Sequence, residues 1–128
     1  MSAGRVVLIV EDNERNLRLA RDVLEFHGYR VVAAENAEDG VALAAAHRPD
    51  VILMDLALPG MDGVEALGVL RANGDTAAIP VVALTASVMQ TDRERVREAG
   101  FAGLIAKPID VLTFHESVAG YCRSEPAR

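Results

Sequence analysis

Five polar side chains stand directly after short apolar segments, and their types suit one kind of chemistry. They are Glu11, Asp12, Asp55, Thr85 and Lys107. Three carboxylates gathered in one place repel one another unless a cation lies between them. Mg²⁺ suits a site that offers a few carboxylate oxygens and keeps some water. A carboxylate held beside such an ion can act as a nucleophile and form an aspartyl phosphate.

Asp55 is the candidate nucleophile, because the four residues before it are apolar and would form a rigid strand. The oxygens of an added phosphoryl group need a cation and a hydrogen-bond donor, which Lys107 and Thr85 supply. Lys107 is the only lysine among 13 basic residues, and the other 12 are arginines. A compact ammonium group differs from the broad guanidinium fork of arginine, so this single use of lysine suggests a specific role.

The apolar segments themselves predict five β-strands. Residues 6–10, 51–54 and 81–84 are continuously apolar rather than alternating, which is typical of strands buried on both faces of a parallel sheet. Two weaker strand candidates are 30–34 and 103–106.

Helical patterns fill the intervals between these strands. The first interval has an apolar face of Leu17, Ala20 and Leu24 and ends at Gly28. A short alanine-rich helix is expected between Asn36 and Pro49. Further helices are expected after Gly63, from about 91 to 100, and from about 110 to 121, where Leu112, His115 and Val118 are inward candidates.

Strand and helix therefore alternate five times, which predicts an α/β fold: a doubly wound parallel sheet with helices on both faces. In such sheets, ligands bind outside the carboxyl ends of the strands. The five polar residues that follow the apolar segments all belong to that edge.

Composition and charge limit the class of protein further. The 128 residues carry 13 basic and 19 acidic side chains, a net charge of −6, with 51% hydrophobic residues. We expect one domain over 1–128 with its core at about 5–122. The single Cys122 excludes an internal disulfide, and the acidic balance disfavours nucleic acid as a partner. Without a signal-peptide pattern or an apolar run of membrane length, we expect a cytoplasmic protein with no membrane partner.

Ordinary structural roles are open to each candidate residue. Asp12 or Asn13 could cap the first helix, and Asp55 could belong to a turn. Thr85 suits a strand end through its β-branched side chain, and Lys107 could be a solvated charge. Because these residues coincide at the ends of four different strands, a shared functional site is favoured over separate structural roles.

Four ordered motifs resemble the receiver domain of bacterial two-component response regulators. They lie at 10–13, 54–63, 84–86 and 106–109, and the resemblance covers about residues 5–122. It implies a CheY-like, flavodoxin-like sheet of order 2-1-3-4-5 flanked by five helices. The first helix region and the end of the 106–109 motif look most similar to stand-alone receivers of the DivK type, which act in polarity and cell-cycle phosphorelays.

The resemblance also implies a role for each matched residue. Asp55 would accept a phosphoryl group from a histidine kinase or a histidine phosphotransfer protein. Mg²⁺ would be held by Glu11, Asp12, Asp55 and the backbone carbonyl of Ala57. Thr85 and Lys107 would contact the phosphoryl group, and the peptide bond between Lys107 and Pro108 would be cis.

Two positions depart from the family pattern. Leu104 stands where many members carry an aromatic residue that turns inward with the threonine on activation, so the coupling would be weaker or use another route. Ala57 is small where related receivers carry longer side chains, which predicts easier access of water to the phosphoryl group and a shorter-lived phosphoaspartate.

The expected function is a phosphorylation switch that signals by binding a downstream protein, as a monomer or weak dimer, and not an enzyme with a separate substrate. The apolar residues Leu17, Pro108 and Ile109 form a candidate docking surface for the phosphodonor. Two alternatives are a phosphate-independent interaction module and a small metal-dependent phosphatase. The complete carboxylate set argues against the first, and the lack of a further general acid argues against the second.

Overall fold

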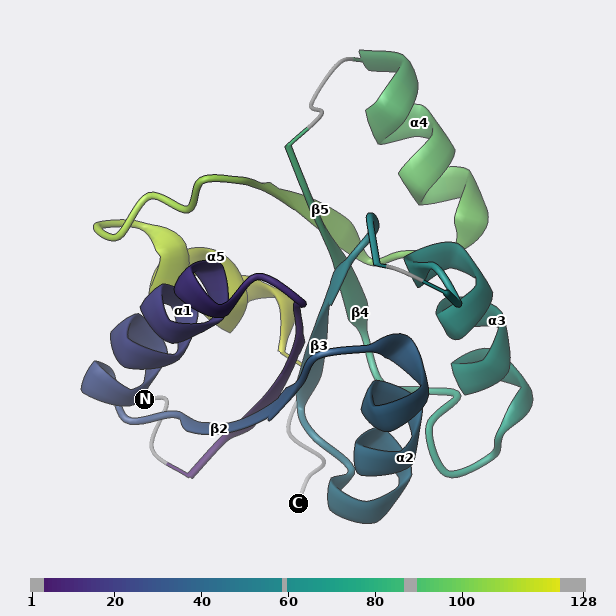
Figure 1. Ribbon diagram of the computed structural model, residues 1–128, viewed down its shortest axis with the longest axis horizontal. Coiled ribbons are helices and arrows are strands. Elements are labelled where there is room, and N and C mark those ends of the chain that lie inside the picture. The colour runs from purple at the N-terminus through teal and green to yellow at the C-terminus, as the bar shows by residue number, and fades with distance from the viewer. Residues whose placement is uncertain (1–3, 59, 87–89, 123–128) are drawn as a thin grey trace.

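The computed structural model describes residues 4–58, 60–86 and 90–122, and within them five parallel strands form one sheet (Figure 1). The spatial order is β2-β1-β3-β4-β5, which confirms the predicted doubly wound topology. Every neighbouring pair is parallel. The strands are β1 (Val6–Val10), β2 (Arg30–Ala34), β3 (Val51–Asp55), β4 (Val81–Thr85) and β5 (Gly103–Ala106).

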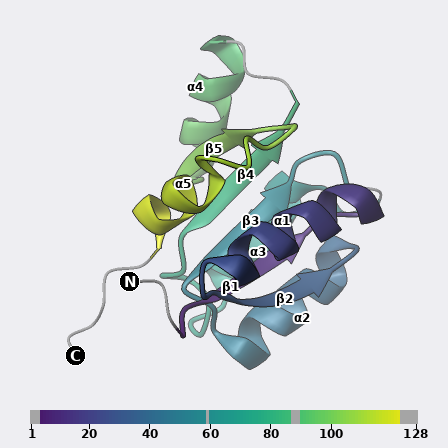
Figure 2. The same cartoon turned by 90° about the vertical axis from the view of Figure 1, so that its left-hand side faces the viewer.

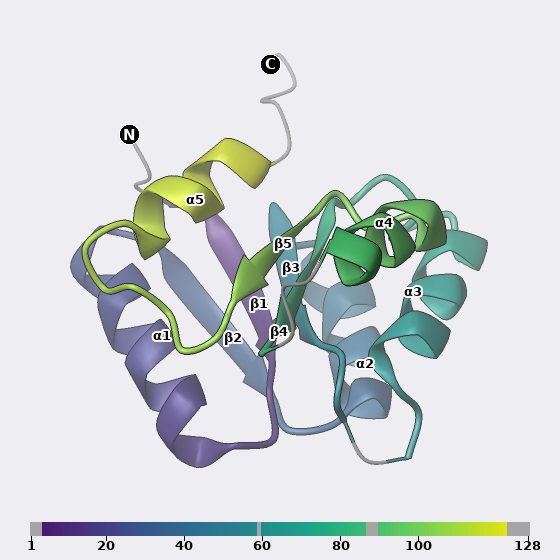
Figure 3. The ribbon, with the colours of Figure 1, turned by 90° about the horizontal axis from the view of Figure 1, so that it is seen from above.

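Helices cover both faces of this sheet, as Figure 3 shows from above. One face carries α1 (Glu14–Phe26) and α5 (Phe114–Tyr121). The other carries α2 (Ala37–His47), α3 (Gly63–Ala72) and α4 (Gln90–Ala99). In the view of Figure 2, α1 and α5 lie side by side across the strands. Within the described part of the chain, no helix has the length and apolar character needed to cross a bilayer.

The sheet divides the apolar core into two clusters. Val10, Ile52 and Met54 face the layer of α2, α3 and α4. Ile9 and Leu53, which alternate with them along β1 and β3, face α1 and α5. All five residues of β3 are buried, so this central strand is fixed from both sides. Such a strand is a firm support for whatever side chain ends it.

Local capping explains where the helices begin and end. Asn13 and Asn36 cap α1 and α2 by accepting backbone N–H bonds at 3.0 and 2.7 Å. The first helix is followed by Gly28, which has a left-handed backbone (φ 93°) as expected from its position. Asp62 and Glu65 form a reciprocal capping box at the start of α3, a signal that our sequence reading had missed.

The last helix differs from its prediction. It begins at Phe114 rather than near Asp110. The Asp110 carboxylate instead accepts a hydrogen bond from the backbone N–H of Leu112 at 3.0 Å, which favours a turn over a helix. The inward placement of Leu112 was therefore wrong, since this side chain is 79% exposed. Val118 is fully buried as predicted, and His115 is half-buried.

Candidate functional site

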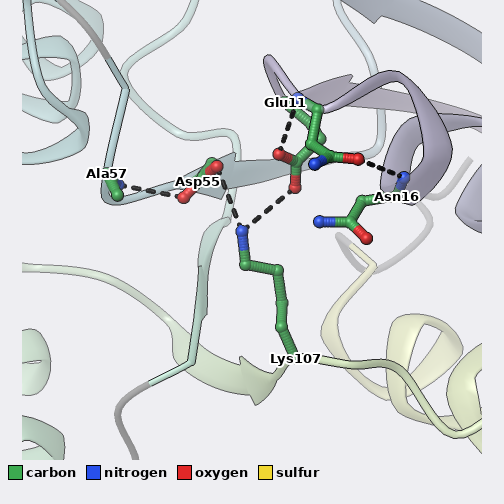
Figure 4. Close-up of polar contacts among 6 residues, drawn as sticks. Glu11, Asn16, Asp55, Ala57 and Lys107 are labelled. Carbon is green, nitrogen blue, oxygen red and sulfur yellow. Dashed lines mark hydrogen bonds and ion pairs between the residues drawn. The ribbon is translucent and has the colours of Figure 1, made fainter.

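The five polar residues singled out from the sequence all lie at the carboxyl edge of the sheet. Asp55 ends β3, Thr85 ends β4, and Glu11 follows β1 directly. Lys107 follows β5, and its backbone N–H donates to the carbonyl of Thr85 at 2.9 Å. Figure 4 shows Glu11, Asp55 and Lys107 with their polar groups pointing toward one another.

The Lys107 ammonium group joins two buried carboxylates. Its Nζ lies 3.2 Å from Oε1 of Glu11 and 3.1 Å from Oδ2 of Asp55 (Figure 4). Glu11 and Asp55 are each only 2% exposed, so neither charge is well solvated. One cation therefore stabilises two carboxylates contributed by residues 96 and 52 positions away along the chain.

Asp55 is held by the backbone around it. The N–H of Ala57 donates to its Oδ1 at 2.9 Å, while Oδ2 contacts Lys107. The start of α3 approaches so closely that a Cβ at Gly63 would lie 2.9 Å from the Asp55 carbonyl oxygen. Glycine at this position is thus needed for a close approach of two backbones. The sequence predicts a helix after Gly63 but not this contact with the backbone of Asp55.

Glu11 is likewise oriented by its surroundings. Its Oε2 accepts a hydrogen bond from the backbone N–H of Asn13 at 3.1 Å. Burial raises the pKa of Glu11 above its usual 4.5; the Asn13 hydrogen bond opposes this, and the nearby Asp55 carboxylate adds to it. The buried Glu11 carboxyl is therefore costlier to ionise than a solvated one.

Asp12 completes the acidic group. It is exposed, and ligand oxygens of Glu11, Asp12 and Asp55 all lie within 4.8 Å of one another. Helix capping by Asp12 is not needed, because Asn13 performs that role through its own side chain. Three converging carboxylates of which two are buried fit a small hard cation, which takes oxygen ligands.

Lys107 keeps its positive charge in this setting. Burial alone would lower the pKa of its ammonium group, but the hydrogen bond and charge of Asp55, together with Glu11, outweigh that and raise the pKa. Its peptide bond to Pro108 is cis, as the family resemblance implies. The half-buried Thr85 lies in register with Ala106, directly beside the start of this segment.

A small pocket of about 30 Å³ adjoins the site on the side of α1. Glu11 and Lys107 line it together with Asn16, Leu19, Pro108 and Ile109. The predicted docking residue Leu17 does not belong to this pocket, because it is only 9% exposed and packs inside with Leu24. It stands on the inward face of the helix, whereas Asn16 and Leu19 stand beside the pocket.

Leu104, which stands where the family pattern has an aromatic residue, lies in β5 and faces the layer of α2, α3 and α4. Leu104 is half-buried and packs against the cluster that contains Phe101. Next to it, a Cβ on Gly103 would collide with the ring of Tyr121 from α5, so this ring lies directly against β5. Leu104, Phe101 and Tyr121 all line a hollow of about 200 Å³.

A parallel 2-1-3-4-5 sheet with a lysine bridging two buried carboxylates at its carboxyl edge defines a class of signalling domains. Residues 7–119 match the family described as the response regulator receiver domain. The chain belongs to this family. It is thus a response regulator receiver, a phosphoacceptor switch.

Two relatives are similar to the chain over most of its length. The chain is 44% identical to the polar-differentiation response regulator DivK of Brucella anthropi over 115 residues, which cover 90% of this chain and 94% of the relative. DivK of Brucella ovis is 42% identical over the same shares. These similarities confirm the resemblance to DivK-type receivers.

Solved structures agree with this assignment. The chemotaxis protein CheY4 of Vibrio cholerae has a TM-score of 0.86 at 25% identity, covering 93% of this chain and 99% of that one. The receiver domain of the sensor histidine kinase PA1611 from Pseudomonas aeruginosa has a TM-score of 0.84 at 35% identity, with 93% and 98% covered. That domain carries a magnesium ion coordinated in its active-site cleft.

Proposed function

We propose that Asp55 is the phosphoacceptor of this receiver. One carboxylate oxygen of Asp55 forms a bond to phosphorus as the bond between phosphorus and a histidine nitrogen of the donor breaks, and the electron pair of that bond stays on the imidazole. The observation that carries this proposal is the double contact of Lys107 with Glu11 and Asp55. In this contact a cation lies beside Asp55, a buried aspartate that ends a fully buried strand.

The acidic residues would hold Mg²⁺ in the same pocket. Its ligands would be Glu11, Asp12, Asp55 and the backbone carbonyl of Ala57, and the magnesium-bearing relative supports this assignment. When bound, the ion neutralises carboxylate charge and the negative charge that develops on phosphoryl oxygens. The acidic cluster would then be compatible with a further, doubly negative group at Asp55.

Lys107 and Thr85 would recognise the phosphoryl group after transfer. The Lys107 ammonium can exchange a contact with Asp55 for one with a phosphoryl oxygen, since both partners are anionic. The Thr85 hydroxyl can donate to another oxygen, which would move the end of β4 relative to β5. Such a shift changes the surface that α4 and β5 present to a partner.

The partners would be a histidine kinase or phosphotransfer protein as donor, and a downstream protein as target. The donor would dock near Pro108 and Ile109, beside the pocket that leads to Lys107. This activity needs no substrate other than the donor, and we propose that it takes place in the cytoplasm, where kinases obtain ATP.

Phosphotransfer tests the assignment of Asp55. Wild type, Asp55→Asn and a control, Asp75→Asn, are incubated with Mg²⁺ and either acetyl phosphate or a panel of phosphorylated kinases. Asp75 is an exposed carboxylate at the surface, paired with Arg48, and should be dispensable. We expect label on wild type and Asp75→Asn and none on Asp55→Asn. Equal labelling of Asp55→Asn would refute the proposal, and absence of label from all three would favour the phosphate-independent interaction module.

A further inference from the structure

Helix α4 buries little of its surface against the rest of the molecule. Of its described side chains, 93–99, only Val96 is buried, and the others are exposed. In Figures 1 and 2 this helix projects beyond the sheet. A helix that packs through few buried side chains moves as a unit at low cost. How α4 moves therefore depends on where it is held.

The C-terminal end of α4 continues directly into the core. Gly100 follows the helix with a left-handed backbone (φ 107°), a conformation that glycine adopts readily at a helix end. The backbone N–H of Phe101 donates to the carbonyl of Val96 at 3.3 Å. The Phe101 side chain is only 5% exposed, and the next N–H, of Ala102, donates to the carbonyl of Val81 at 2.8 Å. This end of the helix is thus tied to β4.

The side chain of Arg71, in the last turn of α3, adds a second tie to the same end. Its Nη1 donates to the carbonyl oxygens of Ala77 at 3.1 Å and Ile79 at 2.9 Å. Its Nη2 donates to the carbonyl oxygen of Gly100 at 3.5 Å. Because a guanidinium group carries donors on several nitrogens in one plane, this single side chain bridges the segment before β4 and the segment after α4.

The segment before β4 is itself held in place, so it offers Arg71 a rigid support. Thr76 is only 1% exposed, and its hydroxyl donates to the carbonyl oxygen of Leu70, near the end of α3, at 2.7 Å. Ile79 is fully buried. A guanidinium group bound to these carbonyls therefore transfers the rigidity of α3 to the end of α4.

Space for movement lies beside α4. The hollow of about 200 Å³ is lined by Arg93, Val96 and Arg97 of α4 and by Leu104 and Tyr121 of β5 and α5. A leucine at position 104 fills less of such a hollow than an aromatic ring would. The helix can therefore tilt toward β5 without displacing a packed side chain.

We propose that Arg71 is a positioning residue that fixes the C-terminal end of α4, so that phosphorylation tilts this helix about Gly100 instead of shifting it as a whole. In the sequence only residues 86–89 separate Thr85 from the first residue of α4, so a movement of Thr85 is passed to that end of the helix. The fixed opposite end converts this movement into a rotation. This route needs no aromatic residue at position 104. It rests on the proposed function, because a phosphoryl group on Asp55 must move Thr85.

Residue-resolved amide hydrogen exchange of the full chain, measured by NMR, tests the anchor. Relative to the amides of β3, which report general unfolding, we expect Arg71→Met to speed exchange of the Gly100 and Phe101 amides by about tenfold. Arg48→Met is the matched control, because Arg48 contacts the same segment before β4 through an exposed ion pair with Asp75. It should change these two amides by less than about twofold. Equal exchange in Arg71→Met and wild type would overturn the anchor.

The same measurement with Mg²⁺ and beryllofluoride, an analogue of the phosphoryl group, tests the tilt. In wild type the change in exchange caused by the analogue should be largest toward the start of α4 and absent at Gly100 and Phe101. In Arg71→Met it should extend to both amides, a result that simple fraying of the helix end does not produce. A uniform change or none along α4 in wild type, or the same gradient in both proteins, would overturn the tilt. Acetyl phosphate should label both proteins equally, so failure of Asp55 as phosphoacceptor would show separately as loss of label.

Discussion

The polar side chains at the ends of β1 and β3 are more deeply buried than those at the ends of β4 and β5. The first two place Glu11 and Asp55 in almost complete burial, between two helix layers. The other two place Thr85 and Lys107 at half-buried positions, and β5 is partly exposed along its length. Side chains with fewer packed neighbours move at lower cost. The site thus combines a fixed acidic half with an adjustable half that can respond to a new charge.

The largest effect should come from removing the cation that joins the two halves. Lys107→Met leaves two buried carboxylates without their shared partner, and we expect a loss of about 3 kcal/mol in the free energy of unfolding. Added Mg²⁺ should recover part of this loss. Urea unfolding with and without the ion measures both effects.

A surface ion pair provides the control for that substitution. Arg48 and Asp75 lie 3.3 Å apart with about 60% of each side chain exposed, so Arg48→Met should cost less than about 1 kcal/mol. Equal losses for the two variants would contradict the view that Lys107 holds the acidic half together.

A glycine-to-alanine substitution should cost more stability in the fixed half of the site than in the adjustable half. Gly63→Ala brings a methyl group against the Asp55 backbone, which cannot withdraw, and should cost about 2 kcal/mol. Gly103→Ala meets the half-buried ring of Tyr121, which can rotate outward, and should cost less than about 1 kcal/mol. Thermal unfolding gives the stabilities, and tyrosine fluorescence reports the displaced ring. A larger loss for Gly103→Ala would reverse the assignment of fixed and adjustable halves.

Magnesium affinity should depend on pH because Glu11, in the fixed acidic half of the site, must be ionised to bind the ion. Mg²⁺ needs ionised carboxylates, and burial raises the pKa of Glu11 above 4.5. As the pH falls through this raised pKa, Glu11 takes up a proton and affinity should fall by up to about tenfold per pH unit. Titration calorimetry across mildly acidic pH measures the slope. An affinity that does not change until the pH falls below 4.5 would show that Glu11 is not a ligand.

The smallest effect concerns access of water to the phosphoryl group. Ala57 is exposed and donates its backbone N–H to Asp55, so a longer side chain there would cover the acceptor without changing that bond. Ala57→Met should lengthen the lifetime of the phosphoaspartate by a few-fold, as measured by loss of label. An unchanged rate of decay would mean that side-chain size at position 57 does not limit hydrolysis.

Sequence alone predicted the strands and the convergence of their polar ends, because buried parallel strands have a distinct apolar pattern. It did not predict that Leu112 would be exposed, since a turn stabilised by Asp110 competes with helix there. It also missed the contact between Gly63 and Asp55, which depends on how α3 approaches β3 in space. The approach of Gly63 to Asp55 arises only when the elements pack, whereas the capping box at Asp62 and the turn at Asp110 are local signals that the residue types offer.

A crystal of the chain grown with Mg²⁺ and beryllofluoride, which mimics a phosphoryl group, tests the central claim most directly. We expect beryllofluoride on Asp55, one ion among the carboxylates of Glu11, Asp12 and Asp55, and Lys107 turned toward a fluorine atom. An acidic pocket that stays without the ion, with beryllofluoride bound to another carboxylate or absent, would contradict it.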